Sequence, residues 1–268
     1  MGYKSKNIKW NRVLIDVCTQ QDFLQAGSIL QVANRELLVA KLQQVFAWAK
    51  QTGTAMVSIV ESHRPTEPLA GFPLHCIDGT PGQAKPDFAQ LQPSMLIEVD
   101  NTLSLPVDLL ERYQQLIFRK RARDVLGNPK ADRFLTQLEA EEFVIFGVGL
   151  DRTIRPLALA LLARHKKVAV VSDACGYWSV ADSDLALRQL AAKNVRLVTT
   201  DELTAPPEPA PPRRVGQRVI LSRYQPSSRR GQSSRQGPSS PTSRSSPRSS
   251  SRPSSRSRSD QPRSGRSP

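Results

Sequence analysis

The sequence has 268 residues and a formal net charge of +14, and its three cysteines are too few and too scattered for a disulfide framework or a cysteine metal centre. No apolar run reaches membrane-spanning length and the first residues lack the apolar core of a signal peptide, so we expect a cytoplasmic protein without a membrane partner. The charge is uneven: residues 205–268 hold 14 arginines against Glu208 and Asp260, a net of +12 that leaves +2 for residues 1–204.

Strand and helix patterns alternate along residues 1–204. Short apolar runs predict strands at 11–18, 54–60, 115–119, 143–148, 168–172 and 195–199, with one further short candidate at 95–99. Apolar residues at helical spacing predict helices at 34–50, 107–113, 130–140, 153–164 and 181–193. This alternation predicts an α/β domain, a Rossmann-like three-layer α/β/α sandwich around a mostly parallel sheet of about six strands. No Gly-x-Gly-x-x-Gly follows the first strand, so dinucleotide binding is unsupported.

Five stretches of this domain carry a family resemblance. They are Cys-Thr-Gln-Gln-Asp-Phe at 18–23, Pro-Leu-His-Cys-Ile-Asp-Gly-Thr-Pro-Gly at 73–82, Lys120 ahead of Asp-Val-Leu-Gly-Asn-Pro at 124–129, Gly-Val-Gly-Leu-Asp-Arg-Thr-Ile at 147–154, and Val-Ser-Asp-Ala-Cys-Gly at 171–176. In this order they resemble the isochorismatase-like cysteine hydrolase superfamily, which includes nicotinamidases. The resemblance extends over essentially the whole domain, and the second stretch is long and specific.

The resemblance implies a catalytic site in which an aspartate takes a proton from a cysteine and a lysine stabilises nearby charge. The thiolate then attacks an amide or similar carbonyl, and backbone amides at a helix start hold the oxyanion. Here Lys120 fills the lysine position, but Thr153 stands in place of the cysteine and Cys18 in place of the aspartate. The amides of Gly149 and Thr153 are the implied oxyanion donors, and the peptide entering Gly149 is expected to be cis. We therefore expect a hydrolase-fold protein with impaired or absent catalysis.

Two of these positions keep a second interpretation. Thr153 is either an N-cap of the helix that follows or a nucleophile. Cys18 is either a small buried residue at a strand end or a displaced nucleophile whose pKa Lys120 lowers. Asp16, two residues earlier on the same strand face, is a candidate to act on Cys18. The alternative function is thus an active hydrolase of a small amide or related substrate that uses Cys18 or Thr153 with Lys120.

The resemblance also implies a metal set. Nicotinamidases place an Asp-x-His after the second strand and a further histidine in the Pro-x-His-Cys loop. Glu61, His63 and His75 occupy the corresponding places, and two histidines with one carboxylate suit a divalent metal. No cofactor is required by the sequence, so a divalent metal at these residues stays an open alternative. His165 is interpreted as a surface residue, and Asp22 and Asp151 as loop ties or caps.

The expected partners follow from the two parts of the chain. Residues 1–204 leave room for a small-molecule ligand, and a homo-oligomer stays open. From residue 205 a Pro-rich linker leads into an Arg/Ser/Pro-rich tail that cannot bury enough apolar surface to fold. Arginines along a flexible arm suit nucleic acid or an acidic protein through counterion release, so residues 213–268 are a candidate binding arm. A solubilising appendage without a fixed partner is the alternative.

Overall fold

The computed structural model describes residues 10–67, 69, 71–99, 105–106 and 108–206, and the basic tail at 213–268 lies outside them. The described strands form one seven-stranded parallel sheet in the order β3-β4-β2-β1-β5-β6-β7. Their bounds are β1 (Trp10–Val17), β2 (Met56–Glu61), β3 (Ser94–Ile97), β4 (Gln115–Lys120), β5 (Ala140–Val148), β6 (Val168–Gly176) and β7 (Arg196–Val198). The predicted α/β class is confirmed, and the short candidate strand supplies the edge strand β3.

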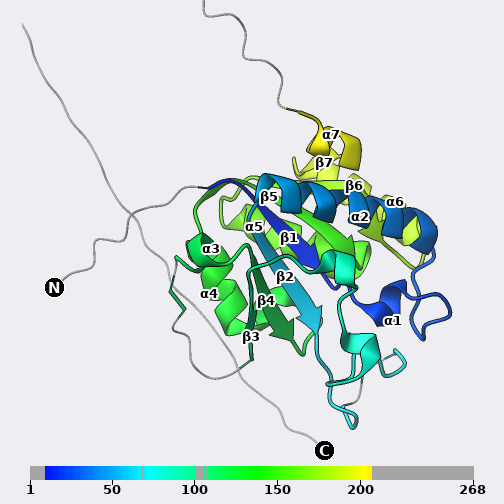
Figure 1. Ribbon diagram of the computed structural model, residues 1–268. Coiled ribbons are helices and arrows are strands. Elements are labelled where there is room, and N and C mark those ends of the chain that lie inside the picture. The colour runs from blue at the N-terminus through cyan, green and yellow to red at the C-terminus, as the bar shows by residue number, and fades with distance from the viewer. Residues whose placement is uncertain (1–9, 68, 70, 100–104, 107, 207–268) are drawn as a thin grey trace, which may run out of the picture. The chain divides into compact units, whose positions relative to one another are not determined.

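Helices cover both faces of the sheet, because the crossovers from β1 to β2 and from β4 to β5 run in opposite directions along it. Figure 1 shows α2 across the near face, with α4 and α5 behind the strands. The α-helices are α1 (Gln21–Leu24), α2 (Arg35–Thr52), α3 (Leu109–Arg112), α4 (Pro129–Gln137), α5 (Arg155–Ala163), α6 (Val180–Ala192) and α7 (Thr200–Thr204), and the shorter turns are η1 (Pro81–Gln83), η2 (Asp87–Ala89), η3 (Val125–Gly127) and the π-helical η4 (Leu150–Ile154). None of the helices in the described part combines the length and apolar character that crossing a membrane requires.

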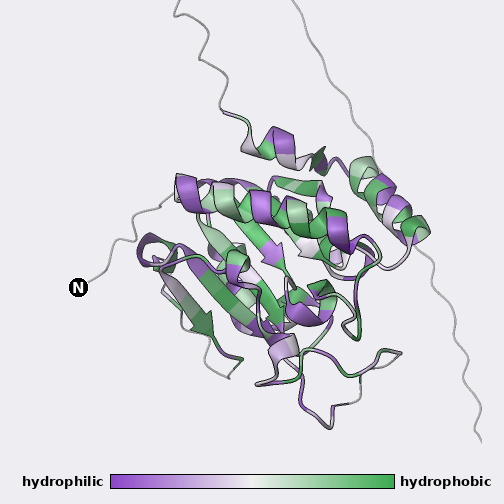
Figure 2. Ribbon diagram, turned by 45° about the vertical axis from the view of Figure 1, so that its right-hand side comes forward, coloured by the Kyte–Doolittle hydropathy of each residue, from purple (hydrophilic) through white to green (hydrophobic). Residues whose placement is uncertain are grey.

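The core lies on both sides of the central strands. Val13, Leu14 and Ile15 of β1 are fully buried, as are Phe143 to Phe146 of β5. A parallel sheet covered on both faces needs such continuous apolar runs rather than alternating ones. In Figure 2 these strands are mostly green beneath α2, which alternates hydrophilic and hydrophobic residues along its length.

β1 and β5 approach each other closely where both strands end. Val17 is paired with Gly147, and a Cβ added to Gly147 would lie 2.1 Å from the Val17 carbonyl oxygen. Gly147 also has φ 119°, a backbone conformation that L side chains rarely adopt. Glycine is therefore required here. Because Gly147 has no side chain, the two strands can approach closely, and the residues that follow β1 lie beside those that follow β5.

Candidate functional site

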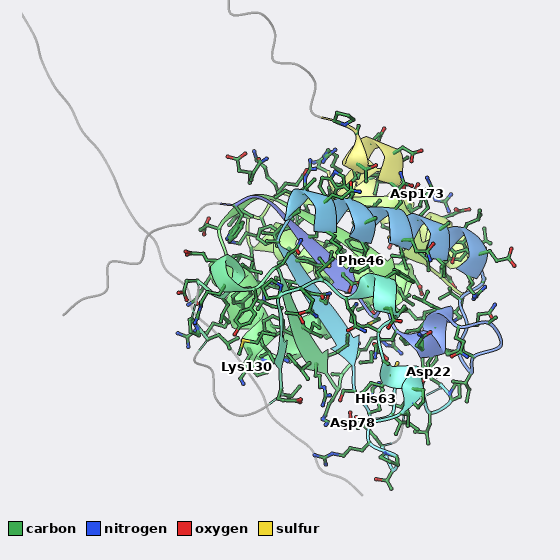
Figure 3. All side chains as sticks on the ribbon, viewed as in Figure 1. Asp22, Phe46, His63, Asp78, Lys130 and Asp173 are labelled. Atoms are coloured by element: carbon green, nitrogen blue, oxygen red, sulfur yellow. The ribbon has the colours of Figure 1, made fainter. Side chains whose placement is uncertain are left out.

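A cavity of about 270 Å³ opens at the carboxyl ends of four neighbouring strands. Its lining includes Cys18 after β1, Glu61 at the end of β2, Lys120 at the end of β4 and Gly149 after β5. The arrowheads of β1, β2 and β4 point to this end in Figure 1, and the label of His63 marks it in Figure 3. In open α/β sheets this edge is the usual position of ligand sites.

A buried ion pair lies at the centre of the cavity wall. Lys120 Nζ lies 2.7 Å from Glu61 Oε1 and also donates to the Ala122 carbonyl at 3.1 Å, and the Lys120 side chain is only 1% exposed. Burial disfavours the Glu61 carboxylate, but the Lys120 charge and hydrogen bonds from His63 and His75 prevail and hold the pKa of Glu61 well below its usual range. The carboxylate and the ammonium are therefore both charged at neutral pH. The predicted Lys120 does line the cavity.

Cys18 lies beside this ion pair. Its Sγ is 3.5 Å from Glu61 Oε1, and its backbone adopts φ 52° as the chain leaves β1. Burial raises the pKa of the Cys18 thiol well above its usual value; Lys120 counteracts this, and Glu61 adds to it. Lys120 therefore does not activate the thiol, because burial outweighs the effect of its charge and Glu61 opposes it as well. In the resting protein Cys18 is a neutral thiol that donates to a carboxylate.

Asp16 belongs to a separate buried network rather than to the cavity lining. It forms an ion pair with Lys85 and accepts a hydrogen bond from Thr19. It also accepts a hydrogen bond of 2.8 Å from Ser58 Oγ. These contacts tie the loop before η2 to the middle of the sheet. The role of Asp16 as an acceptor for Cys18 is thus not supported.

Glu61, His63 and His75 converge as the sequence predicts. One ligand atom from each lies within 4.8 Å of the others. Glu61 Oε2 is 2.8 Å from His75 Nε2 and 3.3 Å from His63 Nε2. The same carboxylate therefore serves the imidazoles through one oxygen and Lys120 through the other.

The hydrogen bonding of His75 tests whether this set fits a metal ion. His75 Nδ1 lies 2.8 Å from the Pro73 carbonyl oxygen, which only accepts, so Nδ1 carries a hydrogen. If the His75 ring were neutral, the lone pair of Nε2 would face the Glu61 Oε2 oxygen, and both atoms would be acceptors. A proton on Nε2 or a metal cation must therefore lie between Nε2 and Oε2. His63 Nδ1 is buried, and in the described part of the chain it has no hydrogen-bond partner. Two imidazoles and one carboxylate arranged in this way fit a divalent cation.

The turn after β5 differs from the expectation for Thr153. Gly149, with φ 88°, is the N-cap of η4, and its carbonyl accepts from the amides of Thr153 at 2.8 Å and Ile154 at 2.9 Å. Thr153 is therefore the fourth residue of η4, and its predicted role as N-cap is wrong because the helical turn begins earlier, at a glycine. A Cβ on Gly149 would lie 3.2 Å from Thr153 Oγ1.

The backbone amides implied as oxyanion donors are engaged in this conformation. The Gly149 amide donates to the Gly176 carbonyl at 2.9 Å, and the Thr153 amide to the Gly149 carbonyl at 2.8 Å. Among the described residues the cis peptide bond is Gln92–Pro93, so the expected cis peptide entering Gly149 is not observed. The oxyanion role of the two amides stays a prediction.

Sequence reasoning missed an aromatic and arginine-rich wall of the cavity. The guanidinium carbon of Arg152 lies 4.4 Å from the centre of the Phe72 ring and 5.4 Å from that of Trp178. Arg123 lies 5.8 Å from the Phe72 ring, and Phe23 packs edge-on against Trp178 at 5.9 Å. Arg152 adjoins Thr153 in the fourth motif, which could have indicated its place, but Phe72 lies in irregular chain without a sequence signal.

The other polar residues singled out in the sequence have structural contacts. Asp22 Oδ2 accepts from the Cys76 amide at 2.6 Å and so ties the Pro-x-His-Cys loop to α1. Asp151 forms an ion pair of 3.4 Å with Arg152. His165 is exposed just after α5, as expected.

Comparisons with known proteins agree with this architecture. The model of a family described as the isochorismatase domain matches residues 13–202. The pyrazinamidase of Pyrococcus horikoshii in complex with zinc superposes with a TM-score of 0.58 at 20% identity, covering 70% of this chain and 99% of that one. An isochorismatase-like hydrolase from Alkaliphilus metalliredigens gives 0.58 at 21% identity, with 72% and 97% covered. A pyrazinamidase/nicotinamidase from Streptococcus mutans gives 0.56 at 18% identity, with 70% and 99% covered. These identities show a shared fold, and the search of curated proteins finds no match.

Proposed function

The chain belongs to the isochorismatase domain family, and from this premise we propose that it binds a small molecule in the family's cavity while the family's covalent hydrolysis is impaired. The observation that carries the proposal is the turn after β5. It presents the hydroxyl of Thr153 in place of a thiol, and the amides of Gly149 and Thr153 already donate to carbonyl oxygens. The centre where the family reaction would form an oxyanion thus lacks both an activated nucleophile and free donors.

The remaining groups do not supply a base for Thr153. A threonine hydroxyl is a much weaker acid than a thiol and requires a committed base. Cys18, at the aspartate position, is a buried thiol, and the Glu61 carboxylate is shared between Lys120 and the two imidazoles. A carboxylate with a lowered pKa is also a poor proton acceptor. The cavity itself is kept, which supports ligand binding.

A divalent cation is compatible with this proposal. The Pyrococcus horikoshii relative was solved with zinc, and in this chain Glu61, His63 and His75 would hold such an ion. A bound cation supplies a Lewis acid that polarises a carbonyl or lowers the pKa of water. Lys120 would then keep its contact with the other oxygen of Glu61 and hold that carboxylate in place.

A second candidate function is hydrolysis through Cys18, and the contact between Sγ and Glu61 Oε1 at 3.5 Å favours it. In that reaction the thiol proton passes to Glu61 while sulfur bonds to the carbonyl carbon of an amide. The C–N bond then breaks, and the proton leaves with the amine. Water hydrolyses the resulting thioester, with Glu61 again accepting and returning a proton. The raised pKa of Cys18 opposes this candidate.

An amidase screen on the full chain tests both candidates. We expect no amide hydrolysis above background by the natural protein. Hydrolysis by the double variant Cys18→Asp/Thr153→Cys, which restores the residue types that the family resemblance implies, would show that the two side chains limit the reaction; an inactive double variant would assign the limit to the engaged amides of Gly149 and Thr153. Turnover by the natural protein would contradict the proposal. In that case, loss of turnover in Cys18→Ala but not in Thr153→Ala would assign it to Cys18, and the reverse pattern would assign it to Thr153.

A further inference from the structure

The two ring nitrogens of His63 lie in different surroundings. Nε2 is 3.3 Å from Glu61 Oε2, on the side where the three candidate cation ligands converge. Nδ1 is buried and, within the described residues, has no hydrogen-bond partner. Buried polar atoms in proteins are nearly always paired, because an unpaired one loses its hydrogen bonds to water without replacement. The unpaired Nδ1 therefore indicates a second state of the protein in which this atom has a partner.

Glu67 supplies a carboxylate on that side of the ring. Its Oε2 lies 3.6 Å from His63 Nδ1, just beyond hydrogen-bond distance. A tight turn places it there, with Pro65 at the second position, where its fixed φ favours a turn. The Glu67 amide donates to the Arg64 carbonyl at 3.0 Å, and the Arg64 amide donates to Glu67 Oε2 at 3.0 Å. The turn thus folds the carboxylate back toward the imidazole.

Arg121 holds the same carboxylate from another side. Its Nη1 lies 4.0 Å from Glu67 Oε2. Arg121 is itself fixed by Asp78 at 3.0 Å and by the Ser62 carbonyl at 3.1 Å. Arg121 and Ser62 directly follow β4 and β2, so these contacts tie the turn to the sheet. A shift of roughly 0.6 Å would bring Glu67 Oε2 within hydrogen-bond distance of His63 Nδ1.

His75 shows the completed form of this arrangement. Its Nδ1 lies 2.8 Å from the Pro73 carbonyl oxygen, and its Nε2 lies 2.8 Å from Glu61 Oε2. Histidines that hold a metal ion through one nitrogen usually donate the other N–H to a carboxylate or a carbonyl, which fixes the tautomer and the ring orientation. His63 presents its nitrogens in the same way, with Glu67 in the place of the Pro73 carbonyl.

We propose that Glu67 is a positioning residue for a divalent cation held by Glu61, His63 and His75. Its carboxylate accepts the Nδ1–H of His63 and so directs the Nε2 lone pair toward the ion. Glu67 does not ligate the ion itself, because it faces Nδ1 and lies outside the set of converging ligand atoms. The proposal rests on the cation that the proposed function admits, and it extends that site to a residue of the following turn.

Zinc affinity of the full chain, measured by competition with a chelating dye, tests this role. We expect Glu67→Ala to weaken Zn²⁺ binding about tenfold or more, as loss of such a partner does in other metal sites. Glu67→Gln should weaken it less, because the amide oxygen still accepts from Nδ1. Asp184→Asn removes the same charge from an exposed position of α6 outside the cavity lining and should leave the affinity unchanged. Unchanged affinity in Glu67→Ala would overturn the proposal, as would the absence of zinc binding by the natural chain.

Nitrogen-15 spectra of the histidine rings separate the hydrogen bond from the mere loss of a negative charge. The chain has three histidines, His63, His75 and His165, so the spectra contain three rings. In the zinc-loaded chain we expect His63 to ligate through Nε2 and its Nδ1 proton to exchange slowly with water. Glu67→Ala should make that exchange fast, while the Nδ1 proton of His75, held by the Pro73 carbonyl, stays slow. Ligation of His63 through Nδ1, or equal exchange in the variant, would overturn the proposal.

These measurements and the amidase screen have distinguishable outcomes. Zinc affinity and proton exchange need no turnover, so an unchanged affinity in Glu67→Ala would leave the impaired hydrolysis intact. Amide turnover by the natural protein would contradict the proposed function and leave the zinc measurements valid. Thermal unfolding of the zinc-free variants checks that they fold. Glu67→Gln keeps the size of the side chain, so it serves as the test if Glu67→Ala folds poorly.

Discussion

Glu61, at the end of β2, provides the carboxylate partner of Lys120 at the end of β4, with Oε1 lying 2.7 Å from Nζ. The resemblance to the family would place an aspartate at Cys18 on β1 near this lysine, but the chain has a thiol there. Glu61 occupies a position where the resemblance implies an aspartate metal ligand, and its longer side chain reaches both Lys120 and the imidazoles. One carboxylate thus satisfies two groups that the family pattern assigns to two aspartates.

The ion pair of Glu61 and Lys120 should be strongly coupled in stability. Lys120→Met leaves a buried carboxylate without its cation, and Glu61→Gln leaves a buried ammonium without its anion, so each should destabilise by about 3–5 kcal/mol. The double variant should lose less than the sum of the two, which urea unfolding measures as a double-mutant cycle. Lys167→Met, at an exposed position, is the control and should change little. Strict additivity would show that the pair is not coupled.

The three cysteines should react slowly in the folded protein. Burial raises the pKa of Cys18, Cys76 and Cys175, which leaves almost no thiolate at neutral pH. We expect slow labelling by a disulfide reagent in buffer and rapid labelling of all three after unfolding. Glu61→Gln should accelerate labelling of Cys18, since it removes a negative charge that raises the thiol pKa. Peptide mapping by mass spectrometry identifies the labelled residue. Fast labelling of Cys18 in the folded protein would contradict the buried, neutral state of its thiol.

Asp78 should contribute a pH-dependent part of the stability. Burial acts to raise its pKa, but hydrogen bonds from Ser62, Arg121 and Gln83 prevail and lower it. The folded state therefore binds fewer protons than the unfolded state, in which an aspartate has a pKa of about 3.9. The contribution is complete above that unfolded pKa and is lost as pH falls through the folded pKa.

Asp78→Asn removes this contribution, so the free energy of unfolding should fall less steeply in the variant than in the natural protein as pH decreases below about 4. Denaturant unfolding across acidic pH measures the slope. Asp184→Asn, at an exposed position of α6, should leave the slope unchanged. Parallel curves for Asp78→Asn and the natural protein would show that Asp78 is not stabilised by its contacts.

Zinc should bind at the two histidines and Glu61. The three ligand atoms lie within 4.8 Å of one another, so little rearrangement is needed. We expect about one Zn²⁺ per chain, and an unfolding temperature that rises with zinc and returns on chelation. His75→Ala should abolish both effects, and His165→Ala should change neither. Residues 205–268 contain no histidine or cysteine, so a zinc response that survives in His75→Ala would place the ion elsewhere in the domain.

The sequence predicted those parts of the site that depend on strand ends and motif spacing. The apolar runs locate β2 and β4, so Glu61, His63 and Lys120 follow at one edge of the parallel sheet. The N-cap role of Thr153 failed because the positive φ of Gly149 starts the helical turn four residues earlier. A sequence pattern carries no information on such a dihedral angle.

The contacts between distant side chains could not be predicted either. The reach of Glu61 from β2 to Lys120 depends on the length of one side chain and on the separation of two strand ends. The wall formed by Phe72, Arg152 and Trp178 joins three segments, one of which has no regular structure. Only a fold that sets the distances between these segments identifies them as one surface.

The basic tail carries the remaining prediction, which is that residues 213–268 bind polyanions. The segment from residue 205 onward holds 14 arginines and two acidic residues, whereas residues 1–204 have a net charge of only +2. Each phosphate that an arginine neutralises on duplex DNA releases a counterion, so the logarithm of the affinity should fall by roughly 0.9 per contact for each tenfold rise in salt. Fluorescence anisotropy with a labelled duplex, for the full chain and for a chain ending at Thr204, measures this dependence. We expect binding and its salt dependence to be lost together on truncation. Binding that remains after truncation would locate the polyanion site in the domain, and a salt-independent affinity of the full chain would exclude the electrostatic mechanism.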